Sequence, residues 1–135
     1  KSLINKLLEP THIYCKLVKD LIANGLDLHG MAHITGGGLP ENLPRCFPRG
    51  LSPLVDSQTW SRPQIFSWLK DEGNIPEVDL WNTFNLGIGF CLVLSSENVQ
   101  PALDICADHQ LPAWLIGRVE ESDPAIANRV LGLPS

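Results

Sequence analysis

The placement of proline and glycine constrains the fold of this chain more than any other feature. The 135 residues contain eleven of each, spread along the whole length. Proline ends or kinks a helix, and glycine weakens the interior of helices and strands, so the elements between them must be short. Helical and strand patterns alternate between these breaks. This alternation predicts an α/β (α+β) class, a layered domain with helices packed on a mixed β-sheet.

Hydrophobic spacing and turn residues give the expected position of each element. Helices are expected at residues 10–25, 39–43, 62–73, 76–81 and 98–111. Strands are expected at residues 28–35, 52–60, 86–94, 113–119 and 128–131. The strand at 86–94 is nearly continuous apolar sequence, which is typical of a strand covered on both faces.

Length and charge limit the classes of protein to which the chain can belong. Its length predicts a single domain over residues 1–135. The net charge of −5 disfavours a nucleic-acid partner, because phosphate neutralisation needs clustered basic side chains. The sequence shows neither an apolar run near the roughly 20 residues of a membrane span nor a signal peptide. It has no initiator Met, so we expect a piece excised from a longer protein.

The four cysteines predict reduced thiols. Cys15, Cys91 and Cys106 lie in apolar stretches, where a free thiol packs like a small hydrophobic group. Neither they nor Cys46 form a Cys-x-x-Cys pair. This pattern favours buried thiols in a cytosolic protein over a disulfide framework or a zinc site.

Residues 33–42 (HITGGGLPEN) join an expected strand to the start of a helix through three glycines. Glycine permits positive φ and lets a ligand approach the backbone closely. The start of a helix adds unpaired amides and a partial positive charge, which together make an anion site suited to phosphate. A tight strand–helix turn without a ligand fits the same residues. Because the spacing matches neither the Walker nor the Rossmann pattern, both interpretations stay open.

Polar side chains near the glycines add candidate ligand contacts. His33 and Thr35 share one strand face and have the donors that a phosphate or amide oxygen needs, although a core histidine and a satisfied hydroxyl are the alternative. His29 also shares that face, but no third ligand is near, so no metal site is expected. Arg45 and Arg49 follow the short helix, either as phosphate clamps or as solvated surface groups.

Residues 82–90 form a second glycine-containing segment. On a strand, Asn85, Gly87 and Gly89 point to the same side, and the two glycines leave that face bare. Such a face accepts a ligand or another backbone, with Asn85 as a hydrogen-bonding group at its edge. Tight packing of a helix there is the alternative.

Three segments resemble the phosphoribosylformylglycinamidine cyclo-ligase family, also called aminoimidazole ribonucleotide synthetase, in its C-terminal domain. Residues 30–45 (GMAHITGGGLPENLPR) are similar to the family's signature loop almost throughout, and residues 83–89 (TFNLGIG) are similar to its second. Residues 10–14 (PTHIY) resemble a third, in which the family has Arg in place of His12, so His12 is given no role. The resemblance runs over nearly the whole chain.

The resemblance implies an ATP-dependent ligase of purine biosynthesis. The family activates the amide oxygen of formylglycinamidine ribonucleotide with ATP and then closes the imidazole ring. It further implies an N-terminal domain, absent here, that binds most of the ATP and Mg and forms a homodimer core in the cytoplasm. No cofactor is therefore expected in this fragment, which should be inactive alone and should self-associate. The catalytic residues stay unassigned, and the residues implied to bind substrate or phosphate in the interdomain cleft are His33, Thr35, Gly36, Gly37, Gly38, Asn42 and Asn85.

Two other functions stay open beside the cyclo-ligase. One is a related ATP-dependent synthetase or kinase of the same superfamily, such as a selenophosphate synthetase, a hydrogenase-maturation protein or an amidotransferase. The other is a non-catalytic regulatory or assembly module on the same fold. An acidic nucleotide-binding segment ahead of this chain would favour an enzyme over a module.

Overall fold

The structure is a computed structural model that describes residues 13–134. The predicted start of the first helix at Pro10 and the departure at His12 lie outside the described residues. The helices and 3₁₀ turns, in chain order, are α2 (Cys15–Ala23), α3 (Gly38–Asn42), η1 (Leu43–Cys46), α4 (Gln64–Gly73), α5 (Glu77–Thr83), η2 (Ser96–Asn98) and α6 (Val99–Asp108). The strands are β1 (Leu28–His33), β2 (Leu51–Val55), β3 (Phe90–Leu94) and β4 (Gly117–Glu121).

The strands form two small antiparallel sheets. In the first, β1 pairs with β3 and places His33 opposite Phe90. In the second, β2 pairs with β4 and places Leu54 opposite Arg118. The α+β class is therefore confirmed, whereas the single mixed sheet is replaced by two separate pairs. Parallel pairing among the described residues is limited to one isolated bridge from Leu54 to Leu131.

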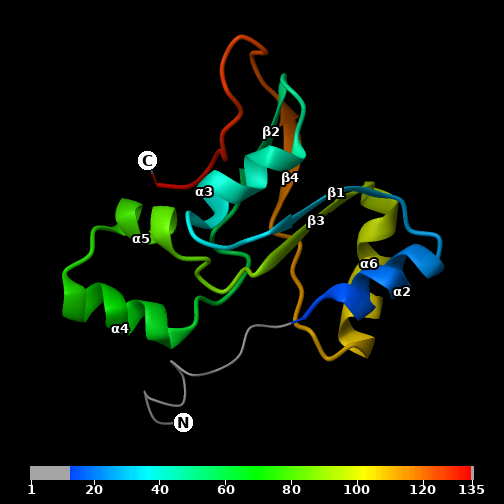
Figure 1. Cartoon of the computed structure of the whole chain (residues 1–135), viewed down its shortest axis with the longest axis horizontal. Helices are drawn as coiled ribbons and strands as arrows, with labels where there is room; N and C mark the ends of the chain where they lie inside the picture. Colours follow the sequence, from blue (N-terminus) through cyan, green and yellow to red (C-terminus); the bar gives the residue numbers. More distant parts are fainter. Residues whose placement is uncertain (1–12, 135) are drawn as a thin grey trace.

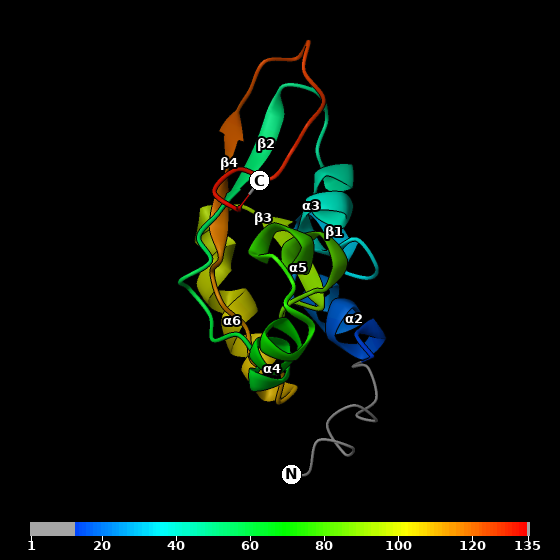
Figure 2. The same cartoon turned by 90° about the vertical axis from the view of Figure 1, so that its left-hand side faces the viewer.

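Helices cover the two faces of the β1–β3 sheet differently. On one face, α2 and α6 bury Leu17, Leu21 and Cys106 against Leu92 and Leu94 of β3. The other face packs against α3, η1 and α5 through a larger core that includes Ala32, Leu39, Leu43, Leu80 and Cys91. In Figure 1, α2 and α6 lie side by side at one end of this sheet and α4 and α5 at the other. Figure 2 shows the β2–β4 sheet extending away from α2, α4 and α6.

Several strands are shorter or shifted relative to the predicted ranges. The strand expected over 52–60 ends at Val55, because the Asp56 carboxylate accepts the Gln58 amide and closes a turn. The strand expected over 86–94 begins only at Phe90, because Leu86 and Gly87 both have positive φ. The strand expected over 113–119 lies instead at Gly117–Glu121, and the terminal strand is reduced to the bridge at Leu131.

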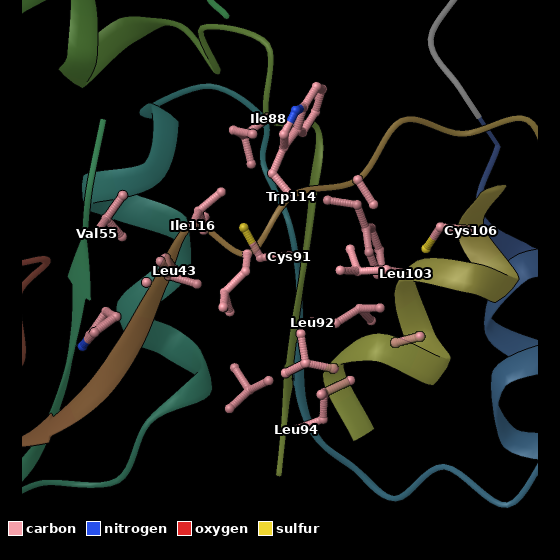
Figure 3. Close-up of a pocket in the computed structure, with 18 of the residues that line it drawn as sticks. Leu43, Val55, Ile88, Cys91, Leu92, Leu94, Leu103, Cys106, Trp114 and Ile116 are labelled. Atoms are coloured by element: carbon pink, nitrogen blue, oxygen red, sulfur yellow. The ribbon is translucent and has the colours of Figure 1, made fainter. Parts of the chain in front are cut away.

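An apolar cavity of about 320 Å³ runs along the edge of β3 that does not pair with β1. Figure 3 shows side chains from both faces of the strand reaching it, with Cys91 on one side and Leu92 on the other. Trp114 and Ile116, from the connection between α6 and β4, also line the cavity. No helix within residues 13–134 has the length and apolar character to cross a membrane.

The prediction for one cysteine needs correction, and the tryptophans divide into buried and exposed pairs. Cys15 is exposed at the start of α2, so it is not a packed hydrophobic group, whereas Cys91 and Cys106 are buried as expected. Trp68 and Trp114 are 41% and 42% exposed. Trp60 and Trp81 are buried, and their rings meet edge-on in the larger core.

Candidate functional site

The glycine turn joins β1 to α3 in a conformation that requires glycine. The Gly38 amide donates to the Thr35 carbonyl at 3.1 Å, which closes the turn. Gly37 and Gly38 have φ of 94° and 62°, values that residues with a Cβ rarely adopt. A Cβ on Gly38 would also lie 2.2 Å from the Trp81 carbonyl oxygen. The turn is therefore pressed against the end of α5 and its path is fixed by backbone contact.

Asn42 organises the turn from the buried side. Its side-chain amide donates to the carbonyl oxygens of Gly38 at 2.8 Å, Gly36 at 3.2 Å and Thr35 at 3.3 Å. Its carbonyl oxygen accepts from the Thr35 hydroxyl at 3.4 Å. The side chain is only 5% exposed, so these bonds satisfy a polar group that burial would otherwise penalise. Asn42 thus holds three carbonyls inward.

The second glycine segment lies beside the first. The Ile34 amide donates to the Gly89 carbonyl at 2.9 Å, just beyond the paired part of the β1–β3 sheet. Asn85 is half-buried, and its side-chain oxygen accepts the Gly87 amide at 3.0 Å. Gly87 has a φ of 102°, and a Cβ there would lie 2.7 Å from Pro63. The bond from Ile34 therefore brings two segments more than fifty positions apart into one place.

His33 ends β1 with an exposed side chain. Its ring lies 6.2 Å from both Tyr14 and Phe90, measured between centroids. Within residues 13–134 its ring nitrogens have no hydrogen-bond partner, so they remain available to a ligand. Tyr14 was not among the predicted site residues, although it closes the third family-like segment. The resemblance of residues 10–14 to the family was the sequence signal that could have identified Tyr14.

The residues of the turn differ in their exposure to solvent. Thr35 and Gly36 are exposed and Gly37 is half-buried, whereas Gly38 and Asn42 are buried. The structure thus brings the predicted residues together in two layers, an outer one open to solvent and an inner one that shapes it. A Cβ on Gly36 would meet nothing within 4 Å, so the space above this residue is open.

The two arginines suggested as phosphate clamps have other partners. Arg45 forms an ion pair with Glu41 at 3.1 Å, one helical turn away. Arg49 donates to the Pro124 carbonyl at 3.2 Å. Within residues 13–134 there is no group of three or more His, Cys, Asp or Glu side chains arranged to hold a metal ion.

Glu77, the first residue of α5, has a strongly perturbed environment. It bonds to Arg62, lies 2.7 Å from the Lys70 ammonium and accepts from the Trp81 indole at 3.1 Å. The hydrogen bonds from Arg62 and Lys70 lower its pKa from 4.5 to about 2. It stays ionised at neutral pH and links α4 to α5 and to Arg62, which is a structural role rather than that of an acid or base.

These features define an α+β domain whose main irregularity is a glycine-rich turn at the end of a strand. The chain belongs to the family described as AIR synthase related protein, C-terminal domain, which matches residues 1–127. It is 56% identical over 135 residues to a phosphoribosylformylglycinamidine cyclo-ligase of Prochlorococcus marinus (strain MIT 9313) and 51% identical over 135 residues to one of Synechococcus sp. (strain CC9902). Each alignment covers the whole chain but only 39% of the relative.

Proposed function

We propose that this chain is the C-terminal domain of a phosphoribosylformylglycinamidine cyclo-ligase. The longer protein would use ATP to close formylglycinamidine ribonucleotide to aminoimidazole ribonucleotide in purine biosynthesis. Family membership and the names of relatives above 50% identity support the assignment. Because the chain spans 39% of those relatives, we expect the rest of the enzyme to supply a further domain and this chain alone to be inactive.

The observation that carries the proposal is the exposed outer layer of the glycine turn. His33, Thr35, Gly36 and Gly37 would contact a phosphate of the substrate or of ATP, since the first three residues are exposed and Gly37 is half-buried. Gly38 and Asn42 would support them, because the Gly38 amide and the Asn42 side chain are already bonded within the turn. Asn85 would shape the adjoining segment through its bond to the Gly87 amide.

The residues of the turn fit phosphate oxygens better than a metal ion. Backbone amides and a hydroxyl are donors for phosphate, whereas Mg²⁺ prefers carboxylate and carbonyl oxygens. We therefore assign the Mg²⁺ and most of the ATP contacts to the part of the enzyme outside this chain. ATP supplies the phosphoryl group that activates the amide oxygen. The role of the turn is to hold phosphoryl oxygens with donors that are already oriented.

We extend the proposal to the partners, oligomeric state and location of the enzyme. Its partners would be a small-molecule nucleotide substrate and the N-terminal domain, and the full-length protein would be a homodimer in the cytoplasm. Neither nucleic acid nor a membrane is expected as a partner. The net charge of −5 supports the first of these two exclusions.

A chimera tests the proposal most directly. The chain would replace the matching C-terminal 39% of the Prochlorococcus marinus (strain MIT 9313) relative. ATP-dependent formation of aminoimidazole ribonucleotide by the chimera, but not by the chain alone, is the expected result. A folded chimera with no turnover, or turnover by the chain alone, would contradict the assignment. His33→Ala in the chimera should weaken substrate binding, and the exposed Trp68→Leu should not.

A further inference from the structure

Tyr14 lies at the entrance to α2, where this helix meets the end of the β1–β3 sheet. Its ring stacks on Phe90, with centroids 4.8 Å apart and an interplanar angle of 27°. It also meets His33 edge-on, at 6.2 Å and 70°. Phe90 and His33 are cross-strand partners. Three rings from three separate segments therefore form one cluster at the end of β1, in geometries that aromatic rings prefer.

Gly89 makes room for this cluster. A Cβ on Gly89 would lie 2.6 Å from the Tyr14 hydroxyl oxygen, closer than real Cβ atoms approach. The Gly89 carbonyl meanwhile accepts the Ile34 amide, one residue after His33. The absent side chain is thus needed for the contact with Tyr14, while the backbone of the same residue fixes the end of β1. Tyr14, His33 and Gly89 each come from a different family-like segment.

The two polar rings of the cluster differ in their surroundings. Tyr14 is half-buried, and burial together with the nearby Cys91 raises the pKa of its phenol, so the hydroxyl stays protonated at neutral pH. His33 is exposed and contacts Tyr14 and Phe90 only through its ring. An exposed imidazole without such neighbours would occupy several rotamers, and a ligand would have to order it.

We infer that Tyr14 is a positioning residue of the phosphate site. Its ring stacks on Phe90, occupies the space left by the missing side chain of Gly89, and fixes the exposed imidazole of His33 beside the glycine turn. The inference rests on the proposed function of that turn. Tyr14 does not itself contact the phosphate. It acts by keeping His33 in one orientation before the ligand arrives.

Three variants of the chain test this role, with Trp68→Leu as a control on the exposed part of α4. His33 ring signals are followed by NMR in the free protein and during titration with inorganic phosphate. Tyr14→Leu and Gly89→Ala should move the His33 signals in the free protein and weaken phosphate binding by between about twofold and about tenfold, the range for loss of an aromatic pair. Tyr14→Phe keeps the ring and should show smaller changes than Tyr14→Leu in both measurements. Trp68→Leu should leave both unchanged.

The outcomes separate this role from the proposed function. If the His33 signals stay at their wild-type positions in both Tyr14→Leu and Gly89→Ala, the positioning role is wrong, whether or not phosphate binds. If the wild-type chain fails to bind phosphate, the proposed phosphate site at the turn is wrong, and the His33 signals of the free variants still decide the role of Tyr14. Gly89→Ala retains the phenol ring, so it provides the test should Tyr14→Leu fail to fold.

Discussion

The side-chain amide of Asn42 donates a 2.8 Å hydrogen bond to the carbonyl oxygen of Gly38, four residues earlier, at the point where the glycine turn becomes α3. The same amide reaches the carbonyls of Gly36 and Thr35. Three carbonyl oxygens are thereby drawn inward by one side chain. The opposite side of the turn, with the Thr35 and Gly36 surface, is left to solvent. The exposed surface of the candidate site therefore depends on the buried side chain of Asn42, which bonds to Thr35 and Gly36 from the inner side.

Removal of that amide should loosen the turn and lower stability. Asn42→Ala removes the side-chain donor from three carbonyls, of which Thr35 keeps the Gly38 amide, so we expect a loss of about 2 kcal/mol in the free energy of unfolding. Urea unfolding followed by circular dichroism measures it. Asn82→Ala, an exposed position on α5, is the control and should change stability by less than about 0.5 kcal/mol. Equal effects of the two substitutions would show that Asn42 does not organise the turn.

Two glycines with positive φ should respond differently to alanine. Gly25 and Gly38 have φ of 79° and 62°, but a Cβ on Gly25 meets nothing within 4 Å, whereas one on Gly38 meets the Trp81 carbonyl at 2.2 Å. Gly25→Ala should therefore cost only backbone strain, about 1 kcal/mol. Gly38→Ala adds displacement of α5 from the turn and should cost at least about 3 kcal/mol. Equal losses in thermal or urea unfolding would mean that α5 does not pack closely on the turn.

Glu77 should make stability depend on pH in the acid range. Its pKa in the folded chain is about 2, below the ordinary 4.5, so its contribution is present above about 4.5 and is lost as the pH falls towards about 2. The side chain is 34% exposed, and solvent screening reduces the effect to about 1 kcal/mol. Wild type should lose this much more stability than Glu77→Gln over that pH range. Parallel pH profiles for the two proteins would contradict the role of the Arg62 and Lys70 pairs.

The four thiols should differ in reactivity. Burial raises the pKa of Cys91 to about 12, with Cys46 contributing, and burial also raises the pKa of Cys46 and Cys106. Only thiolates react readily, so the exposed Cys15 should be labelled first in the native chain at neutral pH. Cys91 and Cys106 should react only after denaturant is added. Cys15→Ser should remove the fast phase, and a fast phase that persists in this variant would contradict the order.

Local signals predicted the helices well, because their ends are determined by nearby residues. Pro63 precedes α4 and Gly73 is its last residue, and Asn98 precedes α6, all close to the predicted ranges. The strands were predicted less well, because their ends depend on partners distant in sequence. The strand expected over 113–119 could not be placed without knowing that Arg118 pairs with Leu54.

The sequence predicted which residue types make up the candidate site, but not which of them are exposed and which are buried. The glycines, His33 and Thr35 stand out as residue types that suit a phosphate, and His33, Thr35 and Gly36 are exposed, whereas Gly38 is buried. Nothing local shows that Asn42 points inward, since this follows from the path of a turn with two positive φ angles. The stacking of Tyr14 on Phe90 was equally hidden, because it joins residues 76 positions apart along the chain.

A phosphate titration of the isotope-labelled chain, monitored by NMR, tests the central claim most directly. Inorganic phosphate should produce saturable shifts at the amides of Gly36 and Gly37 and at the His33 ring, while chloride at equal ionic strength should not. Gly36→Ala should weaken this binding without loss of stability, because its Cβ enters only the open space where the ligand would sit. Shifts no larger than those with chloride, or shifts confined to surface arginines such as Arg118 and Arg129, would contradict a phosphate site at the turn.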